Sequence, residues 1–226
     1  MSLPEPAPGA APASLAATID ATILTPWARP DEVRALCEEA CALQVAAVCV
    51  LPFHVPLARG IVAGTRVRVA AVVAFPGGSA PADAKALEAR RAVEAGAGEL
   101  DAVLNLAAIR AGAWSAVAEE LRAVRAAAPH AVLKWIVETA ALEEPEIRTA
   151  VRMAGESGAD FVKTSTGFGP GGATVAAVRL LRALAGAMGV KAAGGIRTRA
   201  FALELLAAGA DRIGTSAPRA VVEGQA

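Results

Sequence analysis

The stretch GADFVKTS, residues 158–165, decides the fold because it joins the end of a helix directly to a strand. Gly158 suits the left-handed position just past a helix, and the apolar run after it is typical of a strand. The same Gly-Ala junction recurs at residues 96–97 and 209–210. An acid follows each junction: Glu99, Asp160 and Asp211. Strands that alternate with helices in this way predict right-handed βαβ units and a parallel sheet.

Eight strand-like runs, including this stretch, lie along the chain. They are residues 15–20, 45–51, 67–75, 99–106, 131–138, 159–165, 189–194 and 211–216. Helix-start signals lie between most of them, for example Pro30-Asp31-Glu32. Eight strands predict an α/β fold, a single-domain (β/α)8 TIM barrel over residues 14–226. An open doubly wound sheet is the alternative, but no G-x-G-x-x-G motif follows the first strand to support a dinucleotide-binding version.

Composition excludes several classes of function. The chain has 226 residues, 55% of them hydrophobic, and a formal net charge of zero, so it offers no electrostatic footprint for nucleic acid or an anionic membrane. No apolar run approaches the roughly 20 residues of a membrane span. Residues 1–13 predict a disordered Pro/Ala-rich leader without the basic and apolar parts of a signal peptide, so we expect a cytoplasmic protein. Three cysteines and two histidines predict reduced thiols and no metal site.

Lysines are rare, and their positions point to amine chemistry. The chain has only four lysines among its 22 basic residues, and three of them, Lys134, Lys163 and Lys191, fall inside strand-like runs. A lysine can lose its proton and attack a carbonyl, whereas an arginine stays protonated. Buried charges must pair, so we expect these lysines to form one cluster with Asp101. The alternative is a purely structural role, in which these residues form a buried ion-pair network that stabilises the barrel.

Three glycine-rich loops predict a phosphate site. Gly194-Gly195-Ile196-Arg197 follows the seventh strand, Gly214-Thr215-Ser216 ends the eighth, and residues 167–172 follow the sixth. Loops after strands seven and eight, with free helix N-termini, are the usual phosphate site of a TIM barrel. Together with the lysines they predict a small phosphorylated substrate.

The motifs together resemble deoxyribose-phosphate aldolase, a class I family that forms a Schiff base on a lysine. The resemblance runs from Ile19 to Ser216, and its most specific motifs are DFVKTSTGFGPGGAT (residues 160–174) and KAAGGIRT (191–198). It implies reversible cleavage of 2-deoxy-D-ribose 5-phosphate to glyceraldehyde 3-phosphate and acetaldehyde, with no cofactor. It leaves open whether the chain forms a homo-oligomer.

The resemblance also implies a role for individual residues. Lys163 would form the Schiff base, Lys191 would be the second lysine that favours the neutral form of Lys163, and Asp101 would be the acid/base that works with Lys191 and a water. The sugar pocket would be lined by Asp20, Thr22, Cys49, Lys134 and Thr166. The phosphate would be surrounded by Gly167, Gly194, Gly195, Arg197, Gly214 and Ser216.

Some positions depart from the family pattern without touching the proposed catalytic groups. Ala74 stands where glycine commonly precedes Phe-Pro, and Phe168 stands in the glycine loop without a lysine that could reach the anion. The chain has no tyrosine, so a tail tyrosine cannot supply a proton. Another Schiff-base sugar-phosphate aldolase and a non-catalytic phosphosugar-binding barrel remain as alternatives. A metal-dependent aldolase would need a set of histidine ligands, and His54 and His130 are the only histidines.

Overall fold

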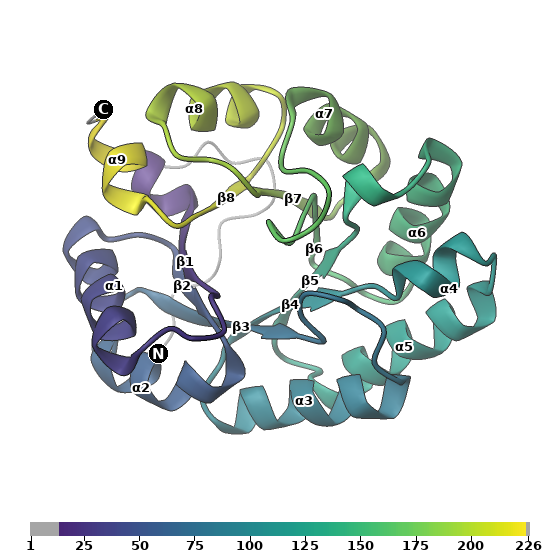
Figure 1. Cartoon of the computed structure of the whole chain (residues 1–226), viewed down its shortest axis with the longest axis horizontal. Coiled ribbons are helices and arrows are strands. Elements are labelled where there is room, and N and C mark those ends of the chain that lie inside the picture. The colour runs from purple at the N-terminus through teal and green to yellow at the C-terminus, as the bar shows by residue number, and fades with distance from the viewer. Residues whose placement is uncertain (1–13, 225–226) are drawn as a thin grey trace.

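Eight parallel strands close into a barrel in chain order, as predicted (Figure 1). The computed structural model describes residues 14–224, so the predicted leader at residues 1–13 lies outside the described part. The strands are β1 Ile19–Ile23, β2 Ala47–Val50, β3 Arg68–Val73, β4 Glu99–Val103, β5 Val132–Ile136, β6 Phe161–Lys163, β7 Gly189–Ala193 and β8 Arg212–Thr215. The expected TIM barrel is confirmed.

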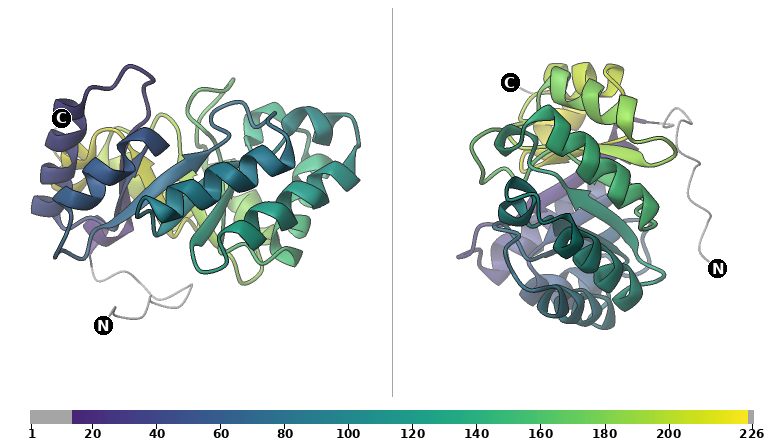
Figure 2. Two further views of the ribbon diagram at one scale, coloured as in Figure 1. Left: turned by 90° about the horizontal axis from the view of Figure 1, so that it is seen from below. Right: turned by 90° about the vertical axis from the view of Figure 1, so that its right-hand side faces the viewer.

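Helices surround the barrel on its outside, which both views of Figure 2 show. They are α1 Pro30–Leu43, α2 Val55–Ile61, α3 Ala82–Glu94, α4 Leu106–Arg110, α5 Trp114–Ala127, α6 Glu144–Glu156, α7 Val175–Leu184, α8 Arg199–Ala207 and α9 Pro218–Glu223. The last helix, α9, packs beside α1 and closes the ring. Within residues 14–224, none of the helices has the length and apolar character needed to cross a membrane.

The three Gly-Ala junctions work as the sequence predicts. Gly96, Gly158 and Gly209 have φ angles of 112°, 80° and 109°, a left-handed region that a residue with a Cβ enters only at a cost. Each glycine turns the chain back from a helix end into the next strand. This repeated device positions β4, β6 and β8.

The acids after these junctions do not all play the same part. Asp160 accepts hydrogen bonds from the backbone of Leu133 and from Arg125. Asp211, just before β8, accepts in the same way from the backbone of Val190 on β7 and from Arg182. Glu99 differs because it comes three residues after its glycine and not two. Strand alternation therefore turns its side chain to the opposite face, into the barrel.

The first strand begins later than expected, and the prediction of a strand over residues 15–20 is wrong at its start. Residues Leu15–Thr18 form a 3-10 turn, and β1 then runs on to Ile23. The hydroxyl of Thr18 donates to the carbonyl oxygen of Leu15 at 2.7 Å, and Ser14 caps the turn. Such local hydrogen bonds from Ser and Thr compete with extended structure.

The fourth strand ends earlier than expected. The sequence predicts one strand over residues 99–106, but β4 stops at Val103. Asn105 instead caps α4, accepting a hydrogen bond from the backbone of Ala108 at 3.1 Å. Asparagine is among the best helix N-caps, which explains why the strand ends before it.

The inside of the barrel is divided into a charged part and an apolar part. The apolar part, which we call the apolar wall, consists of Leu24, Cys49, Leu51, Ala70, Val72 and Phe75. Its residues come from β2, β3 and the loops that follow β1, β2 and β3. The charged residues come from β1 and from β4 to β8, so a ligand in the barrel would meet an apolar side and a charged side.

Candidate active site

Seven buried charged side chains meet inside the barrel, and we call them the charged cluster. They are Asp20, Glu99, Asp101, Lys134, Lys163, Lys191 and Arg212. Strand register brings them together, because Asp101 is the ladder partner of Lys134, and Lys163 is that of Lys191. Paired residues on neighbouring strands point to the same face. The expectation that the strand lysines gather around one acid is therefore confirmed in its geometry.

Asp101 lies at the centre of the charged cluster. Its Oδ1 accepts from the Nζ of Lys134 at 2.9 Å, and its Oδ2 accepts from Lys163 at 2.8 Å and from Lys191 at 2.6 Å. The Sγ of Cys49 lies 3.9 Å from the same Oδ2, at the border with the apolar wall. One carboxylate thus contacts all three strand lysines.

Glu99 and Arg212 complete the cluster, and neither was predicted as a site residue. Glu99 pairs with Lys134 at 2.5 Å and with Arg212 at 3.1 Å. Arg212 also donates two hydrogen bonds to Asp20, whose other oxygen accepts from Lys191 at 2.5 Å. The signal for both was strand alternation: Glu99 is two residues before Asp101, and Arg212 two residues before Gly214.

These contacts hold Asp101 and Lys191 in their charged forms. Burial alone would raise the pKa of Asp101, but the three lysines around it outweigh burial and hold that pKa well below its usual range. Burial would lower the pKa of Lys191, but Asp101 and Asp20 outweigh it and raise that pKa. For Cys49, burial and then the charge of Asp101 raise the thiol pKa to about 11, so the thiol is protonated at neutral pH.

Lys163 differs from the other cations in its number of partners. Lys134, Lys191 and Arg212 each contact two of the three carboxylates, whereas Lys163 contacts only Asp101. The cluster has four cations and three carboxylates, a formal charge of +4 − 3 = +1, and the partly exposed Arg68 of β3 adds a contact to Glu99 at 4.0 Å. Within the cluster, Lys163 is the cation that the fewest carboxylates contact.

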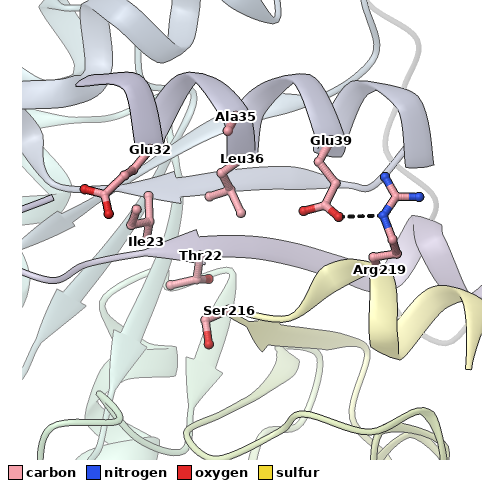
Figure 3. Close-up of a pocket in the computed structure, with 8 residues that line it drawn as sticks. All are labelled: Thr22, Ile23, Glu32, Ala35, Leu36, Glu39, Ser216 and Arg219. Carbon is pink, nitrogen blue, oxygen red and sulfur yellow. Dashed lines mark hydrogen bonds and ion pairs between the residues drawn. The ribbon is translucent and has the colours of Figure 1, made fainter. Parts of the chain in front are cut away.

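Two of the predicted substrate residues, Thr22 and Ser216, line one pocket (Figure 3). This pocket of about 430 Å³ lies between α1, the end of β1 and the link from β8 to α9. Arg219 and Glu39 form an ion pair at 2.9 Å on its far side. The hydroxyls of Thr22 and Ser216 therefore form a rim on this pocket, beside the strands that carry Asp20 and Arg212.

The predicted phosphate glycines fall into three kinds. Gly167 and Gly194 pack against each other, since a Cβ on Gly167 would lie 3.6 Å from the Cα of Gly194. Gly195 is exposed with φ of 78° and open space where a side chain would be, so a ligand can approach its backbone. Gly214 has a different part: a Cβ there would lie 3.2 Å from the Cε of Lys191, so this glycine makes room for the lysine.

The remaining predicted residues lie outside the charged cluster. Arg197 is exposed, just beyond Gly195. Thr166 is buried and bonds through its backbone and its hydroxyl to Oε2 of Glu138, at 3.1 and 2.5 Å. Within residues 14–224 no group of three or more potential ligands is placed to hold a metal ion.

Glu138 and Ser165 are buried polar residues that were not predicted as site residues. Glu138 follows β5 in a left-handed conformation, and its Oε1 has no hydrogen-bond partner among the described residues. The Oγ of Ser165 is also buried without one, two residues beyond Lys163. Both residues lie two positions beyond the end of a strand, Glu138 after β5 and Ser165 after β6. Buried polar groups without partners are expected where a ligand would bind.

Comparison with known proteins identifies the kind of barrel. A family model described as DeoC/LacD family aldolase matches residues 16–224. The deoxyribose-phosphate aldolase of Deinococcus radiodurans is 48% identical over 212 residues, covering 93% of this chain and 96% of the relative. That of Nocardia farcinica is 50% identical over 216 residues, covering 94% and 95%.

A solved structure agrees with these relatives. The tetrameric deoxyribose phosphate aldolase of Aeropyrum pernix superposes with a TM-score of 0.86 at 37% identity, covering 93% of this chain and 90% of that one. The match spans the whole barrel, including the strands that carry the charged cluster. By sequence and by fold, this chain belongs to the DeoC/LacD family of aldolases.

Proposed function

We propose that this protein reversibly cleaves 2-deoxy-D-ribose 5-phosphate to D-glyceraldehyde 3-phosphate and acetaldehyde, through a Schiff base on Lys163. Membership in an aldolase family and relatives named deoxyribose-phosphate aldolase support the reaction. The observation that carries the assignment to Lys163 is its single carboxylate partner in a cluster with one excess positive charge.

Lys163 is the reactive amine because, among the strand lysines, it loses the fewest carboxylate contacts when it gives up its proton. A lysine must lose its proton before its amine can attack a carbonyl. Taking the proton from Lys134 or Lys191 would break contacts with two carboxylates, whereas Lys163 gives up only its contact with Asp101. The ammonium of Lys191, on the neighbouring strand, further disfavours a second positive charge on Lys163.

The chemistry then follows from the iminium. The amine of Lys163 attacks the C1 aldehyde of the open-chain sugar, and loss of water gives a protonated imine. Removal of the proton from the C3 hydroxyl lets the bond between C2 and C3 break, which releases glyceraldehyde 3-phosphate. The electron pair of that bond moves into an enamine on Lys163. Protonation at the enamine carbon and hydrolysis release acetaldehyde and restore the amine.

Lys191 and Asp101 are the groups we assign to proton transfer. They are bonded at 2.6 Å, and both lie against Lys163, so a proton passing to or from the substrate has a short path. Asp20 keeps Lys191 protonated by pairing with it from the other side. Proton transfer by positioned side chains typically contributes about 10²–10⁴-fold to a rate.

We assign the substrate phosphate to the loops after β7 and β8. Gly195 leaves its backbone open, Ser216 lies on the rim, and Thr198 caps the N-terminus of α8 through a bond from the backbone of Phe201. Backbone N–H groups at a helix start favour an anion. The sugar would extend from this rim toward Lys163, along Thr22 and Asp20 of β1.

An assay of product formation tests the function. The purified protein should release acetaldehyde from 2-deoxyribose 5-phosphate, measured by reduction with alcohol dehydrogenase and NADH. Other phosphorylated aldoses and ketoses, such as fructose 1,6-bisphosphate, serve as controls. Faster cleavage of one of these would favour the alternative, another Schiff-base sugar-phosphate aldolase. Saturable binding of deoxyribose 5-phosphate without any cleavage would indicate a phosphosugar-binding barrel.

We also propose a homo-oligomer in the cytoplasm. The solved relative from Aeropyrum pernix is tetrameric, which supports self-association of this chain. Light scattering on the purified protein, coupled to size-exclusion chromatography, measures the mass of the assembly directly. A mass equal to a single chain at micromolar concentration would contradict the oligomer.

A further inference from the structure

The reactive lysine is closed off from solvent. Lys163 is only 2% exposed, and the neighbouring Thr164 and Ser165 are fully buried. A sugar phosphate must nevertheless reach the Nζ of Lys163 for a Schiff base to form. Some group at the carboxyl end of the strands therefore has to move aside before the substrate can enter.

Two aromatic rings meet across this end of the barrel. The rings of Phe75 and Phe168 have centroids 5.3 Å apart and planes at 86°, an edge-to-face contact. Phe75 follows the end of β3 and Phe168 follows the end of β6, with β4 and β5 between them. The pair therefore reaches across the strands that carry Asp101 and Lys134. It lies at the end of the barrel where TIM barrels bind their substrates.

Phe75 is the fixed side of this contact. Its ring packs against the buried residues of the apolar wall, and the segment around it is hydrogen-bonded to its neighbours. The backbone N–H of Ala74 donates to Glu88 at 2.7 Å, and that of Gly78 donates to the carbonyl of Ala74 at 2.8 Å. A Cβ on Gly78 would lie 2.1 Å from the carbonyl oxygen of Leu104, so this loop packs tightly on the end of β4.

Phe168 is the side that can move. It is 50% exposed and belongs to the loop of residues 166–172, which contains four glycines. The loop is fastened at its ends: Thr166 bonds to Glu138, and Ala173 donates to the carbonyl of Gly194 at 3.0 Å. Residues 167–170 between these anchors are exposed, and the backbone N–H of Phe168 donates to the hydroxyl of Thr166 at 3.0 Å. The backbone is held there, so the part that can turn away is the half-exposed ring of Phe168, by rotation about its side-chain bonds.

We propose that Phe168 and Phe75 form an aromatic gate that closes over Lys163 and selects, by size, which aldehydes reach it. The inference rests on the proposed function, because it assumes that Lys163 forms the Schiff base. Closed, the ring of Phe168 completes the apolar wall over the site. Open, it leaves room for the substrate to pass. The two-carbon acetaldehyde passes through a smaller opening than hexanal or the five-carbon sugar phosphate, so entry of the longer aldehydes depends more strongly on the opening of the aromatic pair.

Trapping with borohydride tests the gate by comparing aldehydes of two sizes. The full-length protein is incubated with acetaldehyde or with hexanal in the presence of borohydride, and the adduct on Lys163 is quantified by mass spectrometry over time. An edge-to-face aromatic contact shifts an equilibrium by about twofold to tenfold. In Phe168→Ala, the rate with hexanal relative to acetaldehyde should rise by about this factor.

Four further variants make the result specific. Phe75→Ala should raise the same ratio, and the double variant should rise no further than the larger single effect, because removing either ring opens the gate. Phe168→Leu, which keeps apolar bulk, should fall between Phe168→Ala and the unaltered protein. Phe53→Ala is the matched control, since Phe53 is 83% exposed at the same end of the barrel but outside the pair, and should leave the ratio unchanged.

The outcomes separate the gate from the reaction itself. An unchanged ratio in Phe168→Ala, or a rise equal to that in Phe53→Ala, would overturn the gate while leaving the Schiff base intact. Strictly multiplicative effects of the two Phe→Ala changes would also overturn it, because the rings would then act independently. If acetaldehyde gives no adduct on Lys163 of the unaltered protein, the proposed function itself fails.

Discussion

Lys163 and Lys191 donate to the same oxygen atom, Oδ2 of Asp101, at 2.8 and 2.6 Å. They are ladder partners on β6 and β7, so the backbone fixes this arrangement. Lys191 is held a second time by Asp20, and Lys163 is not. The two lysines are therefore neighbours with different surroundings, and this difference is the basis on which we propose Lys163 as the nucleophile and Lys191 as the lysine that stays charged.

Replacing Lys191 tests the proton-transfer assignment. Lys191→Leu should lower kcat for deoxyribose 5-phosphate by about 10²–10⁴-fold, because the enamine and the C3 hydroxyl lose their proton carrier. The variant should also be less stable, since Asp20 and Asp101 would each lose a buried partner, at a cost of about 3–5 kcal/mol.

Two controls separate activity from stability in this variant. Urea unfolding monitored by circular dichroism gives the loss of stability, and kcat is then measured at a temperature where the variant is folded. Arg152→Leu removes an exposed ion pair with Glu156 on α6, outside the pocket of Thr22 and Ser216, and should change neither quantity appreciably. A kcat close to that of the unaltered protein in Lys191→Leu would show that the charged cluster is purely structural.

Exchanging a glycine tests the phosphate site. Gly195→Ala should lower kcat/KM for deoxyribose 5-phosphate by about tenfold, the value of one charge-assisted hydrogen bond, and much less for unphosphorylated deoxyribose. Gly64→Ala is the matched control, because Gly64 also has φ of 78° and open space around its Cα. Both variants suffer the same backbone strain, so only a phosphate contact distinguishes them. Equal losses on the two substrates in Gly195→Ala would mean that this loop does not bind phosphate.

Glu138 should act by positioning the loop of residues 166–172. Glu138→Gln keeps the shape of the side chain but removes the charge that Thr166 binds, a difference of about 1.5 kcal/mol or more. We expect KM for deoxyribose 5-phosphate to rise by about tenfold while kcat changes little. The exposed Glu144→Gln variant is the control and should behave like the unaltered protein. A fall in kcat at constant KM would contradict a positioning role.

Stability should depend on pH through the charged cluster. The lysines and Arg212 hold the pKa values of Asp20, Glu99 and Asp101 below their usual range. Below about pH 4 these three carboxylates bind protons in the unfolded chain but stay ionised in the folded one. Stability therefore falls as pH falls through and below that value.

The same linkage acts in the opposite direction at high pH. The carboxylates raise the pKa values of Lys134 and Lys191, so their stabilisation is complete below about pH 10 and is lost as pH rises further. Urea unfolding should therefore give a plateau between about pH 5 and 9, with a decline on both sides. A stability that keeps rising from pH 5 down to pH 3 would contradict the pairing.

Repeated local signals explain why so much of the fold could be predicted. A glycine after each of three helices and the alternation of strands with helices are encoded residue by residue, and they predict a closed parallel barrel. The boundaries failed where a side chain bonds to its own backbone. Thr18 bonds back to Leu15, and Asn105 caps a helix, so both leave the extended conformation that an apolar run favours.

The site residues that follow the two-residue alternation of a strand could be predicted, and those beyond the strand ends could not. Asp101 and the three strand lysines follow from alternation, and Glu99 and Arg212 could have been found by counting two residues along the same strands. Glu138 could not, because it lies past the end of β5 in a left-handed conformation that no period of two describes. Its partner Thr166 is 28 residues away, and only the folded barrel brings them together.

The most direct measurement of the central claim is the site of the reduced Schiff base. The protein is treated with acetaldehyde and borohydride, digested, and analysed for an ethyl group on each of its four lysines. Our account predicts modification of Lys163, loss of activity in proportion to it, and no modification at that position in Lys163→Arg, whose guanidinium forms no imine. Modification of Lys85, Lys134 or Lys191 in place of Lys163, or full activity of Lys163→Arg, would contradict it.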